Sequence, residues 1–327
     1  MSIFKVETSA SKKVRTDTMF AVRMYSYGGP EVLRYEEVPR PKAGAGEILI
    51  RVHAAGVNPV DWKIREGYLK EMADRTLPLI PGWDFSGVVD SAGPGAKKFE
   101  VGDEVFGRGD LLRNGAYAEY LVMREEDVEY KPKSVDHIRA AAIPLASLTA
   151  WQSLFEAANL QSGQSVLIHA AAGGVGHLAV QLAKWAGARV IGTASKSNRD
   201  FLMELGVDEA IDYQATRFED VVHKVDVVLD TIGGETQKRS WKVLAKGGIL
   251  VSIVSQPSQE EADSYGVRQS FVFVRNNSTQ LAEIADLVDS GLLVPAVETV
   301  LLLSEAYYAQ ELSKAGHTRG KIVLRIV

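Results

Sequence analysis

The stretch from Ser165 to Gly176 decides the fold of this chain, and it reads Ser165-Val166-Leu167-Ile168-His169-Ala170-Ala171-Ala172-Gly173-Gly174-Val175-Gly176. A short apolar strand enters a glycine-rich turn, and an amphipathic helix is expected directly after it. The pattern is a variant of the dinucleotide-binding fingerprint, with Ala171, Gly173 and Gly176 at the three glycine positions. Gly173 lets the backbone approach a pyrophosphate, Gly176 lets the helix pack closely on the sheet, and the helix N-terminus presents free N–H groups to the anion. A plain glycine-rich turn between a strand and a helix is the alternative interpretation.

From about residue 136 onward, helix-length apolar segments alternate with short buried strands. Near-continuous apolar strands in a βαβα order predict an α/β fold, in which helices cover both faces of a parallel sheet through right-handed crossovers. We expect strands at 165–169, 189–193, 209–212, 225–230, 248–254 and 271–274, and helices at 175–186, 198–205, 235–244 and 279–290.

The chain before this region has a different pattern. From Phe20 to about Leu121, short β-branched or apolar runs are separated by glycine and proline turns, which predicts an antiparallel β domain. The terminal run 321–327 is rich in Ile and Val and needs a sheet to join, so we assign it to this first domain. The predicted division is therefore a β-rich domain over 20–143 and 294–327, a doubly wound NADP-binding domain over 144–293, and a flexible extension over 1–19.

The extension is polar and lacks the apolar core of a secretory signal. Lys12 and Lys13 leave a mitochondrial presequence open, but Glu7 and Asp17 are unfavourable for one. No apolar run approaches the roughly 20 residues that span a bilayer. We therefore expect a cytoplasmic protein with no membrane partner.

The composition excludes several classes of function. The chain has 327 residues with a formal net charge of −5, and it has no cysteine. Without cysteine there is no disulfide framework, thiolate nucleophile, iron–sulfur cluster or Cys-ligated zinc site. The mild negative charge argues against a nucleic-acid partner, which needs a concentrated basic surface.

The tip of the second strand indicates which nicotinamide cofactor binds. An NAD site usually places Asp or Glu there, hydrogen-bonded to the ribose. Here the strand ends in Thr193-Ala194-Ser195-Lys196, without a carboxylate. Ser195 as a donor and Lys196 as a point charge suit a 2′-phosphate, so the sequence favours NADPH over NADH. A solvated helix start is the alternative for Lys196, and Tyr213 is expected either to lie against the adenosine or to be structural.

A set of motifs keeps one order along nearly the whole chain, from about Phe20 to Val327. They are Phe20-Ala21-Val22-Arg23, Gly28-Gly29-Pro30-Glu31-Val32-Leu33, Gly56-Val57-Asn58-Pro59-Val60-Asp61, Pro81-Gly82-Trp83-Asp84-Phe85-Ser86-Gly87, Val101-Gly102-Asp103-Glu104-Val105, Gly115-Ala116-Tyr117-Ala118-Glu119-Tyr120, Leu148-Thr149-Ala150-Trp151 and Gly320-Lys321-Ile322-Val323-Leu324. Together they resemble the zinc-independent quinone oxidoreductase (zeta-crystallin-like) family of the medium-chain dehydrogenase/reductase superfamily.

The resemblance implies a GroES-like β domain built from both chain ends, a Rossmann domain between them, and a cofactor in the cleft. Zinc-dependent members place a Cys where this chain has Asn58, a Gly-His-Glu motif where it has Gly82-Trp83-Asp84, and a four-cysteine zinc lobe where it has only the segment 108–114. These ligands are absent, so we expect hydride transfer without a metal, which disfavours alcohol oxidation. Relatives are often homodimers or homotetramers joined through edge strands of the Rossmann sheet, and 271–274 is the apolar edge candidate.

The resemblance also implies site residues. Thr149 matches a position near the nicotinamide ring, with helix packing as the alternative, and Lys63 stands where relatives often have an aromatic residue that reaches the cofactor. The other cofactor candidates are Ala172, Gly173, Gly174 and Val175 around the pyrophosphate; Ser195, Lys196 and Tyr213 at the 2′-phosphate end; Ile232, Ser252 and Val254 at the carboxyl ends of strands; Phe271 and Phe273 on the nicotinamide side; and Lys321 in the terminal segment.

Asn58 and Tyr68 join Thr149 as candidate catalytic residues. Asn58 matches a position in the active-site cleft that hydrogen-bonds a water or a carbonyl oxygen, with an Asx turn as the alternative. Tyr68 is a candidate proton donor to the reduced acceptor, although solvent also supplies protons.

The leading hypothesis is an NADPH-dependent, zinc-independent oxidoreductase that transfers hydride to quinones or other α,β-unsaturated carbonyls. One alternative is an enoyl-thioester or 2-alkenal reductase, which a basic groove at the mouth of the cleft would favour. The other is a non-catalytic NADPH-binding protein, which tight cofactor binding without turnover would favour.

Overall fold

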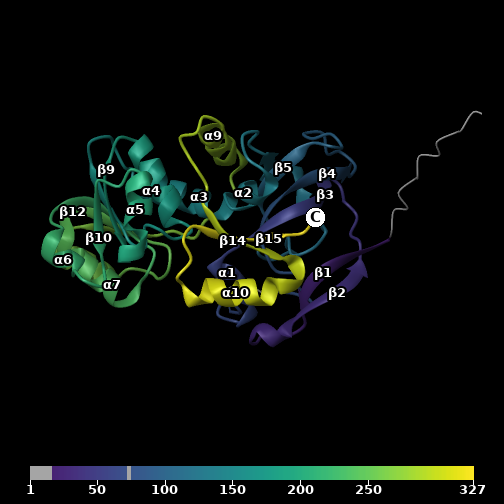
Figure 1. The fold of residues 1–327 in the computed structure, drawn as a ribbon, viewed down its shortest axis with the longest axis horizontal. Coiled ribbons are helices and arrows are strands. Elements are labelled where there is room, and N and C mark those ends of the chain that lie inside the picture. The colour runs from purple at the N-terminus through teal and green to yellow at the C-terminus, as the bar shows by residue number, and fades with distance from the viewer. Residues whose placement is uncertain (1–16, 72–74) are drawn as a thin grey trace, which may run out of the picture.

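The computed structural model describes residues 17–71 and 75–327. Figure 1 shows two bodies, one formed by the middle of the chain and the other by its two ends. Residues 1–16 of the predicted extension lie outside the described part. The end of that extension is not a free tail, because β1 (Thr18–Met24) already begins within it and pairs with β2 (Leu33–Pro39).

The middle of the chain forms a six-stranded parallel sheet, which confirms the predicted α/β fold. The strand order is β10-β9-β8-β11-β12-β13, so the direction of winding reverses beside β8. In such sheets ligands bind outside the carboxyl ends of the strands at that reversal. The strands are β8 (Ser165–Ile168), β9 (Arg189–Ala194), β10 (Glu209–Asp212), β11 (Val225–Asp230), β12 (Leu244–Ser252) and β13 (Arg268–Phe271).

Successive residues of these strands face opposite sides of the sheet, as the period of two requires. Val166 and Ile168 belong to one core cluster with Leu178 of α4, whereas Leu167 belongs to a second cluster with Trp241. Both faces are therefore covered, which is why the strands are nearly continuous apolar runs. The helices of this half are α4 (Gly176–Trp185), α5 (Arg199–Glu204), α6 (Phe218–Val221), α7 (Gly234–Ser240), α8 (Gln259–Tyr265) and α9 (Ser278–Asp289).

The two chain ends share a seven-stranded sheet of order β14-β15-β3-β4-β5-β7, in which β6 also pairs with β3. The last strand lies antiparallel to β3, with Ile322 opposite Val57. Figure 1 shows the yellow C-terminal strands beside the purple β3. The strands are β3 (Glu47–Val57), β4 (Asp84–Ala92), β5 (Glu104–Arg108), β6 (Tyr120–Arg124), β7 (Val128–Tyr130), β14 (Val297–Leu302) and β15 (Lys321–Arg325).

Four helices accompany the second sheet or connect the two bodies. They are α1 (Pro59–Arg65), α2 (His137–Ala141), α3 (Pro144–Trp151), which continues into a π-helical segment over Gln152–Ala157, and α10 (Ala306–Ala315). Among the residues that the structure describes, no helix is long and apolar enough to cross a membrane.

Two predicted elements need correction. The sixth strand is Arg268–Phe271 rather than 271–274, because its ladder with β12 ends where Phe271 meets Ser252. An edge strand is hydrogen-bonded on one side only, so it carries polar residues and lacks the continuous apolar pattern of a buried strand. The prediction was therefore placed on the apolar run that follows the strand. The predicted helix over 235–244 ends at Ser240, and Leu244 already begins β12.

Candidate functional site

The glycine-rich turn brings backbone close to the end of β8. Ala170 has φ of 45°, a left-handed conformation that is costly for a residue with a side chain and that is often found at ligand sites. A Cβ at Gly176 would collide with the carbonyl oxygen of Ala170, so α4 is able to start here only with glycine. A Cβ at Gly174 would lie 3.1 Å from Cδ of Lys321, a residue of the last strand. The turn therefore packs directly on the C-terminal segment.

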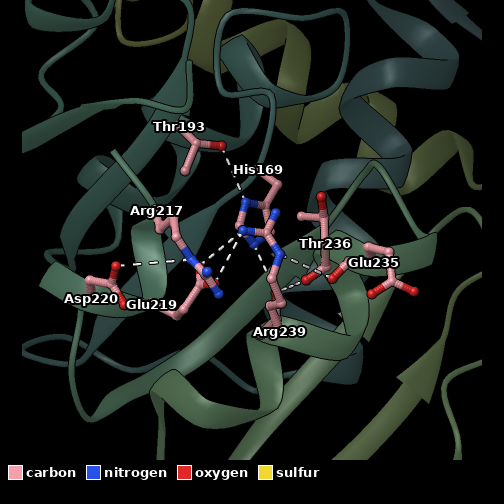
Figure 2. Close-up of polar contacts among 9 residues, drawn as sticks. His169, Thr193, Arg217, Glu219, Asp220, Glu235, Thr236 and Arg239 are labelled. Carbon is pink, nitrogen blue, oxygen red and sulfur yellow. Dashed lines mark hydrogen bonds and ion pairs between the residues drawn. The ribbon is translucent and has the colours of Figure 1, made fainter. Parts of the chain in front are cut away.

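His169 anchors the end of β8 below this turn. Its Nδ1 lies 3.2 Å from Oγ1 of Thr193 on β9, and its Nε2 lies 2.9 Å from Oγ of Ser240 on α7. Figure 2 shows His169 beside Thr193, with Arg239 and Glu219 forming an ion pair nearby. Burial lowers the pKa of His169 to about 4. The imidazole is therefore neutral at physiological pH and joins three elements rather than exchanging protons with a ligand.

His177 ties the turn to the start of the C-terminal segment. The backbone N–H of Ala296 donates to Nε2 of His177 at 3.2 Å, so Nδ1 carries the proton and donates to the carbonyl of Gly173 at 2.9 Å. Burial lowers the pKa of His177 to about 4, in agreement with this neutral tautomer. One imidazole therefore fixes the turn against the crossover into β14.

A cavity of about 700 Å³ opens beside the turn, at the carboxyl ends of β8 and β9. It joins five of the predicted cofactor residues: Ala172, Gly173, Ser195, Lys196 and Tyr213. Arg319 also lines it, and its Nε donates to Oδ1 of Asn198 at 2.8 Å, whose Nδ2 in turn donates to Oγ of Ser195 at 3.1 Å. Two cations and a hydroxyl thus line the cavity where β9 ends without a carboxylate. The cavity also contains Glu298 of β14, whose Oε2 accepts from the backbone N–H of Arg319 at 2.9 Å.

A second polar centre is buried between α1 and the last strand. Asn58 is 2% exposed and Lys321 is 3% exposed. The ammonium of Lys321 donates to Oδ1 of Asn58 and to the carbonyl of Val57 (2.9 Å), and it lies 3.7 Å from Oδ2 of Asp84. Asn58 Nδ2 donates to the same carboxylate oxygen at 2.9 Å. Two predicted site residues, Asn58 and Lys321, are therefore in direct contact, and both polar atoms of the Asn58 amide have protein partners.

Asp61 extends this centre toward the β sheet. Its Oδ2 accepts from the backbone N–H of Asn58 at 2.9 Å and from the hydroxyl of Tyr117 at 2.8 Å, whereas its Oδ1 is buried without a partner among the described residues. Burial raises the pKa of Asp61 to about 7 and raises the pKa of Asp84 above its usual range, although the nearby Lys321 ammonium opposes both shifts. Burial also lowers the pKa of Lys321.

The residues at this centre do not fit a zinc ion. Zinc takes three or four thiolate, imidazole or carboxylate ligands, whereas here the carboxylate of Asp84 faces an ammonium and an amide N–H. Within residues 17–71 and 75–327, no group of three or more Cys, His, Asp or Glu side chains is arranged to hold a metal ion.

The remaining predicted residues are less closely gathered. The hydroxyl of Thr149 donates to the carbonyl of Leu145 at 2.6 Å, within its own helix. Tyr68 is 69% exposed and lies edge-on to Trp62 at 5.9 Å, and the half-buried Lys63 approaches the same Trp62 ring.

The candidates beyond β11, β12 and β13 also differ in their surroundings. Ser252 is buried and its hydroxyl donates to Asp230 at 2.8 Å. Phe273 is exposed and lines a different cavity from the one at the turn. Three further candidates are in place at or just after strand ends: Ile232 and Val254, both exposed, and Phe271, partly buried. Val175 and Gly174 lie in the turn itself.

A glycine-rich turn at the switch point of a Rossmann sheet, joined to a GroES-like β domain, defines the class of nicotinamide-dependent dehydrogenases and reductases. Residues 44–133 match the family described as alcohol dehydrogenase GroES-like domain, and residues 205–324 match the family described as zinc-binding dehydrogenase.

Named relatives extend over almost the whole chain. The chain is 36% identical to a 2-methylene-furan-3-one reductase of Solanum lycopersicum, over 97% of this chain and 81% of the relative. It is 31% identical to the mitochondrial NAD(P)H oxidoreductase RTN4IP1 of Mus musculus, over 97% of this chain and 92% of the relative. The solved quinone oxidoreductase from Coxiella burnetii superposes with a TM-score of 0.90 at 36% identity, covering 95% of this chain and all of that one. The chain belongs to the quinone oxidoreductase-like family of the medium-chain dehydrogenase/reductase superfamily.

Sequence reasoning missed several residues of these centres. The pairing of Asp84 with Lys321, the bond between Asp61 and Tyr117, and the burial of Arg108 carry no signal in local pattern. Each residue stands in or near a family-like motif. However, Asp84 and Lys321 meet only when β3, β4 and β15 come together, Asp61 reaches Tyr117 from α1, and Arg108 lies opposite Asp84 on β5.

Proposed function

We propose that this chain is an NADPH-dependent oxidoreductase that transfers hydride to quinones or other α,β-unsaturated carbonyls. The observation that carries the proposal is the cavity at the glycine-rich turn, which Ser195, Lys196 and Arg319 line where β9 ends without a carboxylate. The acid among its lining residues, Glu298, comes from β14 and accepts from the backbone N–H of Arg319. A 2′-phosphate is the group that such a lining recognises, and an NAD ribose would instead need an acidic partner. The names of the relatives, which include reductases of furanones and of alkenals or enones, support the acceptor class.

Bound NADPH supplies the hydride, so that a quinone plus NADPH and a proton give the hydroquinone and NADP⁺. The residues of the chain bind and orient the reactants. Gly173 and Gly174 allow the backbone to approach the pyrophosphate, and Lys196 with Arg319 balances the 2′-phosphate. Lys321 packs against Gly174 and donates a hydrogen bond to Asn58, so Asn58 acts as a positioning residue in this proposal. Thr149 borders the nicotinamide side, and Tyr68 remains the candidate proton donor from its exposed position.

Two alternatives belong to the same site. An enoyl-thioester or 2-alkenal reductase uses the same hydride donor on a different acceptor. A non-catalytic NADPH-binding protein uses the same cofactor residues without an acceptor. Turnover separates the two: an enzyme oxidises NADPH only when an acceptor is added, whereas a binding protein retains the reduced cofactor.

The test is an acceptor screen with the purified full-length chain. NADPH oxidation is followed at 340 nm with 1,4-naphthoquinone, a 2-alkenal and an enoyl thioester, alongside metal analysis of the same sample. We expect acceptor-dependent oxidation of NADPH. Tight binding of NADPH, seen by fluorescence, without turnover of any acceptor would overturn the proposed activity and favour the binding protein.

We also propose a homodimer formed through the edge of the Rossmann sheet, together with a cytoplasmic location. β13 is an edge strand of the six-stranded sheet, with unpaired backbone groups along one side. Light scattering should give the mass of two chains, and introducing Pro at Gln269 should shift it toward one. A mass of one chain at micromolar concentration would contradict the dimer. Recovery of the protein in an organelle fraction would contradict the cytoplasmic location, because some relatives are mitochondrial or chloroplastic.

A further inference from the structure

A cavity of about 430 Å³ lies between the loop that follows β5 and the segment that follows β13. Pockets of this size take small organic ligands. Its apolar surface includes the exposed side chains of Leu112 and Phe273. Its charged lining residues leave a formal balance of +2, because four are arginines and two are aspartates: Arg75, Arg108, Arg124, Arg275, Asp110 and Asp127.

Arg108 is the buried cation of this lining. It is 5% exposed, and its Nη1 donates to Oδ1 of Asn276 at 2.6 Å. Its Nε is buried without a partner, and no carboxylate of the described residues lies within ion-pair distance of its guanidinium. Burial lowers the pKa of Arg108, and the carboxylates of Asp84, Asp110 and Asp127 oppose this shift from beyond ion-pair distance. A buried cation without a bonded anion is costly, so an anion that entered the cavity would be stabilised there.

The neighbouring arginines are already engaged. Arg275 forms two bonds of 2.8 Å with Glu156, and Arg124 lies 3.7 Å from Asp110. Arg75 donates to the carbonyls of Leu111 (3.1 Å) and Leu69 (2.8 Å). Among the arginines of this lining, Arg108 is therefore the one whose buried Nε lacks a partner among the described residues.

Arg108 is also adjacent to the proposed catalytic cleft. The register of β4 and β5 places Asp84 directly opposite Arg108, and neighbouring strands lie about 4.8 Å apart. The carboxylate of Asp84 accepts a hydrogen bond from Asn58 and lies near the ammonium of Lys321, so its negative charge interacts more closely with these groups than with Arg108. The cavity is also lined by Phe273, for which the family resemblance implies a position on the nicotinamide side. A ligand in this cavity would thus extend toward the place where hydride is transferred.

We propose that this cavity binds the anionic end of the acceptor and that Arg108 determines the preference for anionic over neutral acceptors. The inference rests on the proposed reductase activity and specifies its substrate class. A guanidinium presents a planar set of donors to a carboxylate, sulfonate or phosphate, and Leu112 with Phe273 provides apolar surface for the carbon skeleton.

The test compares matched acceptors under NADPH. The first pair is 1,4-naphthoquinone-2-sulfonate against 1,4-naphthoquinone. The second pair is crotonyl-CoA against the neutral crotonyl thioester of N-acetylcysteamine. The first pair places the anion on the acceptor ring itself, whereas the second places phosphates on the carrier, so the two pairs together distinguish these sources. For the full-length wild type we expect a higher kcat/KM for the anionic member of at least one pair, and we expect this preference to decline as NaCl is raised.

The variant Arg108→Met should lower the anionic-to-neutral ratio of kcat/KM at least tenfold, and Arg108→Lys should retain part of it. The control is Arg113→Met, which removes the same charge from the same loop but from a side chain that lines a different cavity, and its ratio should stay at the wild-type value. If Arg108→Met fails to fold, the salt dependence of the wild-type ratio decides. A wild type that reduces neutral quinone without any anionic preference overturns this inference and leaves the proposed activity intact, whereas no reduction of any acceptor overturns the activity itself.

Discussion

The Nζ atom of Lys321 lies 3.7 Å from Oδ2 of Asp84, and both side chains are buried. Lys321 begins the last strand, Asp84 begins β4, and the strand between them is β3. The same lysine packs against Gly174 of the glycine-rich turn. One cation therefore links the C-terminus, the β sheet of the N-terminal half and the Rossmann turn.

Removing this cation should destabilise the protein strongly. Lys321→Met would leave Asp84 as a buried carboxylate without its neighbouring positive charge, and we expect a loss of about 3 kcal/mol in the free energy of unfolding by urea. The double variant Lys321→Met/Asp84→Asn should recover part of that loss. Lys98→Met, which removes a partly exposed ion pair with Glu129, is the control and should cost less than about 1 kcal/mol. Equal losses for the two lysines would contradict the linking role.

Asp61 should make stability decrease as pH rises from about 4 to 7. Its folded pKa is raised to about 7, whereas the unfolded chain titrates near 3.8, so in this window the folded state holds a proton that the unfolded state has lost. Asp61→Asn does not titrate. The stability of this variant relative to wild type should therefore grow by on the order of 1 kcal/mol per pH unit between pH 4.5 and 7. Urea unfolding at several pH values measures it, and a constant difference would show that Asp61 is ionised when folded.

His177 should act in the opposite direction. Its folded pKa is lowered to about 4, while the unfolded chain binds a proton near pH 6.5, so stability is lost as pH falls between these values. His177→Asn should be less stable than wild type at pH 7.5, because the bond from Ala296 is disturbed, but its stability should fall less steeply toward pH 4.5. Parallel curves for the variant and the wild type would mean that His177 does not contribute to the acid sensitivity.

Lys196 should discriminate between the two nicotinamide cofactors. Lys196→Glu places a negative charge in the cavity beside the turn, where it would repel a 2′-phosphate and suit a ribose hydroxyl. The KM for NADPH should rise at least tenfold, and the KM for NADH should change far less. Arg199→Glu, another residue near the end of β9 with the same change of charge, serves as the comparison. Equal effects of Lys196→Glu on both cofactors would remove the 2′-phosphate role.

The local pattern predicted the parallel fold of the Rossmann half and the start of its sheet. Strand Ser165–Ile168, the turn at Gly173 and the helix from Gly176 follow from apolar periodicity and glycine spacing, which are properties of neighbouring residues. The edge strand was placed too late, because a strand paired on one side has no strict apolar alternation. Likewise, the pattern named Asn58 and Lys321 separately but not their contact.

The sequence by itself determined the class of fold, the glycine-rich turn after the first parallel strand and the absence of cysteine ligands, because each depends on residue type at short spacing. The tertiary structure alone decided which charges face one another. Asn58, Asp84 and Lys321 come from three distant parts of the chain and meet only through the order β15-β3-β4. Arg108 stands opposite Asp84 only through the register of β4 and β5. The physical reason is that burial and electrostatic pairing depend on positions in space, and strand register fixes those positions over separations that no local pattern records.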